Sequence, residues 1–244
     1  MANQDNNVSG GLFFLGLFVA IGLGFAGYFI GNTMYNAKVA LNTAEAKGLA
    51  ERRVTSDTAN WSVGFAVAAK RQSDIPALYK TAENHQNKII GILKENGFKD
   101  DEITVGVIDY HYNEYRDDNQ TVVDQTHTLR GSIQVETQQV ELVSQVRSKV
   151  NKLIAEGVNI QNHQPNYRFT KLNEIKPEML REATKNARIA ANEFAENAGV
   201  SVGGIRSARQ GSFYVRDAGE EYGDRMKIEK DVRVVTTITF YLTD

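Results

Sequence analysis

The sequence predicts an α+β protein with a single transmembrane helix near its N-terminus, in which further helices pack on mainly antiparallel sheets. Three observations predict this. One uncharged apolar stretch occupies residues 11–31. Segments with helical spacing of apolar residues follow it, and segments that alternate apolar and polar residues lie between them. This order is neither a strict alternation of strand and helix nor an all-strand pattern, so it favours helices packed on antiparallel sheet.

The composition is typical of a chain that folds over most of its length. Hydrophobic residues make up 41% and charged residues 24% of the 244 residues, and Pro occurs only 3 times, so long disordered linkers are not expected. The formal net charge of -2 gives no basic surface for a phosphate backbone, which argues against nucleic acid as a partner. The Cys count is 0, which excludes disulfides and thiolate chemistry.

Residues 11–31 are predicted to cross a membrane once, after a short polar N-terminus at residues 1–10. At about 1.5 Å per residue, a helix of this length spans the roughly 30 Å hydrocarbon core of a bilayer. A cleaved signal peptide is the alternative interpretation. It is disfavoured because Asp5 is the only charge before the stretch and no small-residue cleavage motif follows Gly31.

Small residues recur at a spacing of four within the predicted membrane helix. This spacing lets two helices approach closely in lipid, and it therefore predicts self-association through the membrane. Gly is also common in membrane helices, so chance is the alternative explanation. The residues concerned are Gly16, Ala20, Gly24, Gly27 and Gly31.

The segment after the anchor bears on orientation and on the start of the soluble region. Lys38 and Lys47 follow the anchor and no Lys or Arg precedes it, which by itself favours a cytoplasmic soluble region. Residues 32–47 are rich in helix-forming Ala, Leu, Glu and Lys, with no Pro or Gly after Gly31. We expect the helix to continue through them as a stalk.

The soluble region is expected at residues 48–244, in two sub-structures at about 48–138 and 139–244. Residues 49–71 are typical of two strands or one interrupted strand. Ser73 then begins a helix with Pro in its first turn, and Gly97 ends it.

Two alternating segments after this helix predict a long hairpin, with a charged and solvated tip. We expect the tip to project, and its candidate subunit contacts are Tyr115, Arg116, Asp117 and Asp118.

In the second half, Thr137 is expected to cap a helix that ends at Gly157, and Pro177 to open another that ends at Gly199. The apolar face of the latter helix is predicted to comprise Leu180, Ala183, Ala187, Ala190, Ala191 and Phe194.

Two strands at residues 207–215 and 232–242 complete the pattern. The polar loop between them, residues 216–230, has no packing stripe and is expected to order only in an assembly. Its candidate subunit contacts are Asp217, Glu220 and Glu221.

The segment GLAERRV at residues 48–54, with Asp57 and Trp61 after it, resembles the opening of SIMPL-domain proteins of the YggE-like group. The Ala-rich segment at residues 183–205 is similar to that family's third helix and the turn after it. The resemblance extends over about residues 48–242, which is nearly the whole soluble region, although its motifs are diffuse.

The resemblance implies an exported bacterial envelope protein, with the soluble domain in the periplasm and the anchor in the inner membrane, against the signal of the two lysines. It also implies an α+β fold with two sub-structures, large ring-like or hollow homo-oligomers and a link to stress response. The family has no established catalytic residues to carry over. We therefore expect no enzyme, no cofactor and no metal site, and a second copy of this chain as the partner.

Two other groups of residues give weaker hypotheses about metal binding and catalysis. His111 and His127 could face each other across the hairpin and form a metal site with Asp109 or Asp124, but surface or half-buried histidines are the simpler interpretation. The acidic run at residues 100–102 is more typical of a turn than of acid–base chemistry.

An alternative function follows from a surface formed by Arg206, Arg209 and Tyr214. It would make the protein a monomeric or dimeric envelope module that binds an anionic or glycan ligand. Solvated arginines paired with Glu220 and Glu221 are the simpler interpretation.

Overall fold

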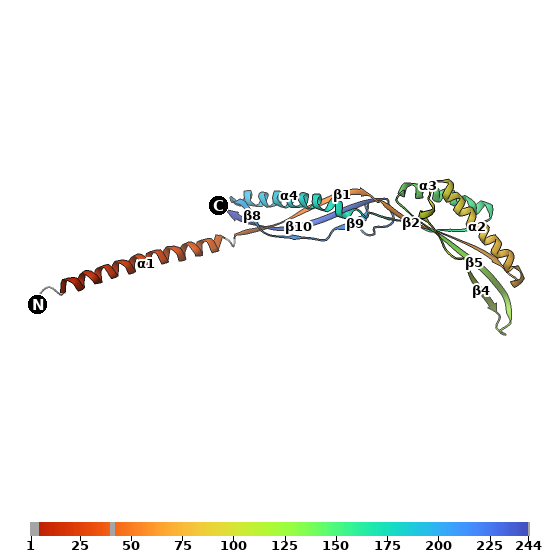
Figure 1. Ribbon diagram of the computed structural model, residues 1–244, viewed down its shortest axis with the longest axis horizontal. Coiled ribbons are helices and arrows are strands. Elements are labelled where there is room, and N and C mark those ends of the chain that lie inside the picture. The colour runs from red at the N-terminus through yellow and green to blue at the C-terminus, as the bar shows by residue number, and fades with distance from the viewer. Residues whose placement is uncertain (1–4, 40–41, 244) are drawn as a thin grey trace. The chain divides into compact units, whose positions relative to one another are not determined.

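The computed structural model describes residues 5–39 and 42–243, and it confirms the mixed α+β class (Figure 1). The chain divides into two compact units. Unit 1 combines Met1–Ala50, Leu180–Ser212 and Val234–Asp244, and unit 2 combines Glu51–Met179 and Phe213–Arg233. These units are interleaved along the chain and differ from the expected halves at 48–138 and 139–244. The reason is that strands from the two ends of the soluble region pair with each other.

Helix α1 (Asp5–Val39) contains the predicted anchor. Its segment Leu12–Tyr35, 24 residues long, is apolar and long enough to cross a membrane, and none of that segment is buried. The helix continues past Gly31 as expected, but the stalk does not reach Lys47. Thr43–Lys47 instead begins strand β1 (Thr43–Thr55), in which Ala46, Gly48 and Ala50 alternate with exposed residues and face the interior.

Unit 1 is a sheet with strand order β1-β10-β8, covered on one face by the part of helix α4 (Leu172–Ala198) that begins at Leu180. Strand β10 (Glu229–Thr243) lies in the centre, and β8 (Ser201–Gln210) pairs antiparallel to it. A small core joins Ala46, Ala187, Ala191, Ile238 and Phe240. The Ala residues of α4 allow the helix to lie close against the strands.

Gly48 marks the closest approach of β1 to α4. A Cβ atom at Gly48 would lie 1.8 Å from the carbonyl oxygen of Ala183 and 2.4 Å from the backbone nitrogen of Ala187. Only Gly fits there, which gives the GLAERRV segment a physical reason for its first residue.

Helix α4 begins at Leu172, earlier than the expected start at Pro177. The Asp57 carboxylate accepts hydrogen bonds from the backbone N–H groups of Thr170 and Lys171, so a side chain from a distant segment stabilises this entry to the helix. The proline signal alone could not reveal that contact.

The buried face of α4 is a row at a spacing of four: Met179, Ala183, Ala187, Ala191 and Ala195. Phe194 lies about 100° around the helix from the last member of this row and is 62% exposed, so its expected place on the packed face is wrong.

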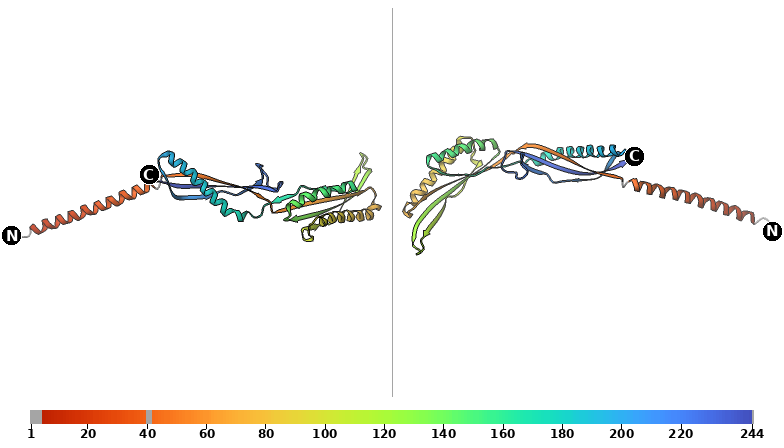
Figure 2. Two further views of the ribbon diagram at one scale, coloured as in Figure 1. Left: turned by 90° about the horizontal axis from the view of Figure 1, so that it is seen from above. Right: turned by 180° about the vertical axis from the view of Figure 1, so that it is seen from behind.

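Unit 2 is a second sheet with order β3-β5-β2-β6, in which β4 pairs with β5 and β7 with β2. Helices α2 (Ile75–Glu95) and α3 (Val140–Asn151) cover one face of it (Figure 2). The strands are β2 (Thr58–Ala69), β3 (Ile103–Val105), β4 (Asp109–Arg116), β5 (Val122–Thr137), β6 (Asn159–Asn162) and β7 (Asn166–Arg168).

Trp61 lies fully buried in the core of unit 2, as its place in a strand predicts. Its indole N–H donates a 2.8 Å hydrogen bond to Oδ1 of Asn162, so the polar edge of the ring is satisfied.

Candidate functional site

The predicted hairpin is formed by β4 and β5, and it extends past the strand beside it. Strand β2 pairs with β5 only as far as the pair Ala69–His127. The outer part, Asn113–Arg116 with Val122–Thr126, is therefore a two-stranded ribbon. Every residue of β4 is exposed, and among the described residues β4 pairs with β5 alone. One edge of the whole hairpin and both edges of its outer part are thus open.

The tip of this hairpin has a defined conformation. The Asp117 carboxylate accepts the backbone N–H groups of Asn119 and Thr121, and the Arg116 guanidinium donates to the carbonyl of Gln120. Gln120 takes a left-handed conformation with φ of 63°. Tyr115 and Arg116 therefore lie exposed at the end of β4, next to a preformed turn in which Asp117 is half-buried and Asp118 exposed.

A Tyr–His–Tyr cluster lies at the base of the outer ribbon. The Tyr110 hydroxyl is 2.7 Å from Nδ1 of His127, and the Tyr112 ring stacks on the same imidazole at a centroid distance of 5.0 Å. His127 is only 3% exposed. These contacts hold β4 against β5 at the point where the outer ribbon leaves the sheet.

The hairpin register separates the two histidines considered for a metal site. His127 pairs with Tyr112, whereas His111 pairs with Thr128, so His111 and His127 lie on opposite faces. Within the residues described, no group of three or more His, Asp and Glu side chains is arranged to hold a metal ion.

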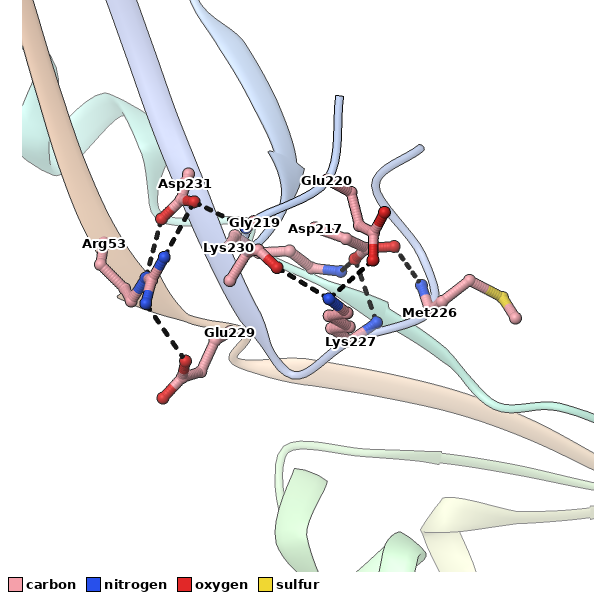
Figure 3. A network of polar contacts seen from close by, with 10 residues as sticks. Arg53, Asp217, Gly219, Glu220, Met226, Lys227, Glu229, Lys230 and Asp231 are labelled. Carbon is pink, nitrogen blue, oxygen red and sulfur yellow. Dashed lines mark hydrogen bonds and ion pairs between the residues drawn. The ribbon is translucent and has the colours of Figure 1, made fainter. Parts of the chain in front are cut away.

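The polar loop between the last two strands folds around a buried ion pair (Figure 3). Strand β9 (Tyr214–Asp217) pairs with β10, and its Asp217 lies opposite Lys230. Nζ of Lys230 is 2.5 Å from Oδ1 of Asp217, and the side chains are 0% and 2% exposed. The same carboxylate accepts the backbone N–H groups of Met226 and Lys227.

These contacts set the charge state of Asp217. Burial alone would raise the pKa of its carboxyl, but the hydrogen bonds from Lys230 and from the loop backbone outweigh burial and hold the pKa below its ordinary value. Asp217 is therefore a structural anion inside unit 2, and it is not available at the surface as a subunit contact.

The loop is ordered within the single chain, contrary to the expectation that it orders only in an assembly. The carbonyl of Arg225 accepts the N–H of Tyr167, and Ile228 packs against the core of unit 2. Glu220 and Glu221 are exposed, and Glu220 pairs with Lys227 at 2.8 Å. Both carboxylates remain candidate contacts.

The proposed arginine surface is divided between the two units. Arg206 and Arg209 are exposed on β8 in unit 1, whereas Tyr214 belongs to unit 2, where its ring contacts Arg216 at 5.6 Å. Arg209 lines a shallow groove of about 280 Å³ on the open face of the unit 1 sheet. The other lining residues are Glu45, Lys47, Ser207, Ala208, Thr237 and Thr239.

Comparison with known protein families supports the resemblance to SIMPL-domain proteins that the sequence suggests. A family model described as "SIMPL: Protein of unknown function (DUF541)" matches residues 45–240. The chain belongs to the SIMPL family. The match covers nearly all of the strands of both sheets, and it confirms the resemblance seen at residues 48–54 and 183–205.

The other comparisons do not extend this SIMPL assignment. No curated protein matches the chain. Two solved structures share 10% identity with it, one named as an aminohydrolase from methicillin-resistant Staphylococcus aureus and one as an amidohydrolase/peptidase from Burkholderia cenocepacia. The first match covers 58% of this chain and 37% of the solved chain, with a TM-score of 0.27. The second covers 52% of this chain and 34% of the solved chain, with a TM-score of 0.23. The SIMPL chain thus spans about a third of their length.

The acidic run of this SIMPL chain forms a short turn, as predicted. Asp100–Glu102 is a 3₁₀ helix, and Glu102 accepts the backbone N–H of Lys99 and the hydroxyl of Thr137. Burial would raise the pKa of Glu102, but these hydrogen bonds lower it below its ordinary value. Glu102 borders a polar depression of about 810 Å³, which sequence reasoning missed because it joins segments far apart in the chain.

Proposed function

We propose that this SIMPL protein is a non-enzymatic, membrane-anchored protein of the bacterial envelope whose periplasmic region assembles with further copies of itself into a ring or cage. The outer part of the β4–β5 hairpin is the observation that carries the proposal. A two-stranded ribbon is marginally stable alone in water, and open strand edges pair readily with another chain.

The side chains of the ribbon favour a protein partner. Within the ribbon Tyr115 is 60% exposed and Val123 64%, and just below it Tyr112 is 44% exposed. Tyrosine is enriched where proteins meet, because the ring buries apolar area and the hydroxyl still hydrogen-bonds. The open strand edges and the exposed Tyr115 ring on one ribbon together suit addition to a strand of a second copy.

The anchor would promote this assembly. In the α1 helix, successive residues are about 100° apart, so Gly16, Ala20, Gly24, Gly27 and Gly31 share an arc of about 80°. This places all five small residues on one face, which suits close helix packing in lipid. Confinement to a membrane also raises the effective concentration of neighbouring copies, so a weak contact would suffice to close a ring.

The ionisation of four buried or half-buried carboxylates supports a role without catalysis. A general base works best with a pKa near neutrality. Asp57, Glu102, Asp217 and Asp231 instead have lowered pKa values, because hydrogen bonds to backbone, hydroxyl or cationic groups outweigh any burial. These side chains act as structural anions in the fold.

The mass of the detergent-solubilised full chain, by light scattering after size exclusion, tests the proposal. We expect a large and discrete oligomer, which the double variant Tyr115→Lys/Val123→Lys reduces to smaller species without lowering the melting temperature. Ile154→Lys is the matched control, because Ile154 is 55% exposed on the same unit outside the ribbon. A monomer or dimer for the unmodified chain, or an unchanged mass for the double variant, would refute the assignment.

A second candidate function is binding of a small anion in the unit 1 groove. Arg209 and Lys47 supply two cations there, and Ser207, Thr237 and Thr239 supply hydroxyl donors. This hypothesis predicts heat of binding for inorganic phosphate or sulfate in titration calorimetry that weakens with salt and is lost in Arg209→Ala. Assembly alone predicts no such heat.

A further inference from the structure

A very short connection joins the anchor helix to the sheet of unit 1. Helix α1 ends at Val39 and β1 begins at Thr43, so four Cα–Cα steps separate them. At no more than about 3.6 Å per step, Thr43 lies within about 14 Å of Val39 whatever path the chain takes. The covalent chain thus holds the start of β1 near the end of the membrane helix.

Several other chain segments end at this same end of unit 1. The backbone N–H of Leu242 donates to the carbonyl of Asn42 at 2.9 Å, and Thr243 pairs with Ser201. Helix α4 ends just before, at Ala198. We call this the anchor end of unit 1, defined by residues 42–44, 194–202 and 241–243.

The anchor end is within reach of lipid headgroups. The apolar span of α1 ends at Tyr35, and four further helical residues to Val39 advance about 6 Å along the axis. The interfacial layer on each side of the hydrocarbon core is about 5–8 Å thick. Val39 therefore lies near the outer limit of that layer if Leu12–Tyr35 spans the bilayer.

Phe194 is the large apolar side chain at this end that the chain leaves uncovered. It is 62% exposed, whereas its neighbour Ala195 is 2% exposed and packs inside. Eight residues earlier on α4, Asn186 donates its side-chain amide to the carbonyl of Leu49 on β1. Eight residues turn a helix by about 80°, so Phe194 points within a quarter-turn of Asn186, the side chain that contacts β1.

We propose that Phe194 inserts into the interfacial layer of the bilayer and seats the anchor end of unit 1 on the membrane surface. Aromatic rings favour this layer, because it accepts an apolar body beside polar groups. Glu193 and Glu196 flank Phe194 and are exposed, so the contact is apolar and gains nothing from anionic lipid. The proposal rests on the membrane anchorage in the proposed function, but not on assembly.

The test uses the full chain with Phe194→Trp in phosphatidylcholine vesicles that contain brominated lipid. Native Trp61 is fully buried in unit 2, so the unmodified chain supplies the background emission. The matched control is Ile189→Trp, because Ile189 is 50% exposed on the same helix but points about 140° away from Phe194.

We expect brominated lipid to quench the additional emission of Phe194→Trp at least twofold, and that of Ile189→Trp much less. Equal quenching of both variants, or quenching of neither, overturns the proposal. Flotation of the same vesicles reports anchorage, and light scattering of the same variants reports assembly. A chain that floats and assembles without quenching therefore refutes the Phe194 contact alone, whereas a chain that does not float refutes anchorage as well.

Discussion

Lys230 and Asp217 face each other across strands β9 and β10, and their side chains meet at 2.5 Å with almost no exposure to solvent. The pair lies where the loop at 218–228 leaves and rejoins the sheet. The Asp217 carboxylate also accepts hydrogen bonds from two backbone N–H groups of that loop. One carboxylate therefore couples the ion pair to the loop conformation.

Removal of one partner of this pair should be costly. Asp217→Asn leaves the buried Lys230 ammonium without its counter-charge, for which we expect a loss of about 3–5 kcal/mol in the free energy of unfolding. Urea denaturation of the detergent-solubilised chain measures it. The exposed pair Glu220–Lys227 is the control, and Glu220→Gln should cost no more than about 1 kcal/mol. Equal stability of both variants would show that the ion pair is not structural.

Asp57 should make stability depend on pH in the acid range. Burial would raise its pKa, but hydrogen bonds from Thr170, Thr58 and the backbone of Lys171 lower it below the ordinary value. A lowered folded pKa stabilises the fold above the unfolded value of about 3.9, and this contribution disappears as the pH falls through the folded pKa. The difference in urea midpoint between the unmodified chain and Asp57→Asn should be constant at neutral pH and shrink below about pH 4. A difference independent of pH would exclude this role.

Gly48→Ala should disrupt the packing of α4 on β1. The added methyl would overlap the Ala183 carbonyl oxygen, which belongs to helix backbone and cannot rotate away. We expect a loss of at least about 1–3 kcal/mol, the usual cost of overpacking, seen as a lower melting temperature. Gly204→Ala is the control in the same unit, since a Cβ there meets no atom within 4 Å. A tolerated Gly48→Ala would mean that α4 moves freely relative to the sheet.

Trp61 should report the unfolding of unit 2 specifically. As the only tryptophan of the chain, fully buried and hydrogen-bonded to Asn162, it should resist iodide quenching until unit 2 unfolds. Quenching followed along a urea titration gives the unit 2 transition. Ready quenching in the native state would contradict the buried indole.

Local periodicity was sufficient for most elements of the fold. The apolar N-terminal helix, the helix ending near Gly97 and the long hairpin follow from apolar spacing and turn residues, which act within a few positions. Thr43–Lys47 shows the limit of such reasoning. Its helix-forming residues adopt a strand because Ala46 packs against α4, which comes more than a hundred residues later.

The candidate sites show the same limit. The polar segment at residues 216–230 predicts a solvated loop, yet two of its charges pair inside the protein through strand pairing that the local pattern does not reveal. Whether His111 and His127 share a face depended on the register of β4 and β5, because a shift by one residue moves a side chain to the other face. The division of Arg209 and Tyr214 between two units likewise follows from long-range pairing.

The order of strands in unit 1 also has a consequence for biosynthesis. The central strand β10 is made after both of its neighbours, β1 and β8. A ribosome therefore delivers the two flanking strands first, and neither has its backbone partner until residues 234–243 emerge. Unit 2 receives β2 to β7 in a continuous stretch and its last segment, Phe213–Arg233, before β10 is complete, whereas the unit joined directly to helix α1 closes last.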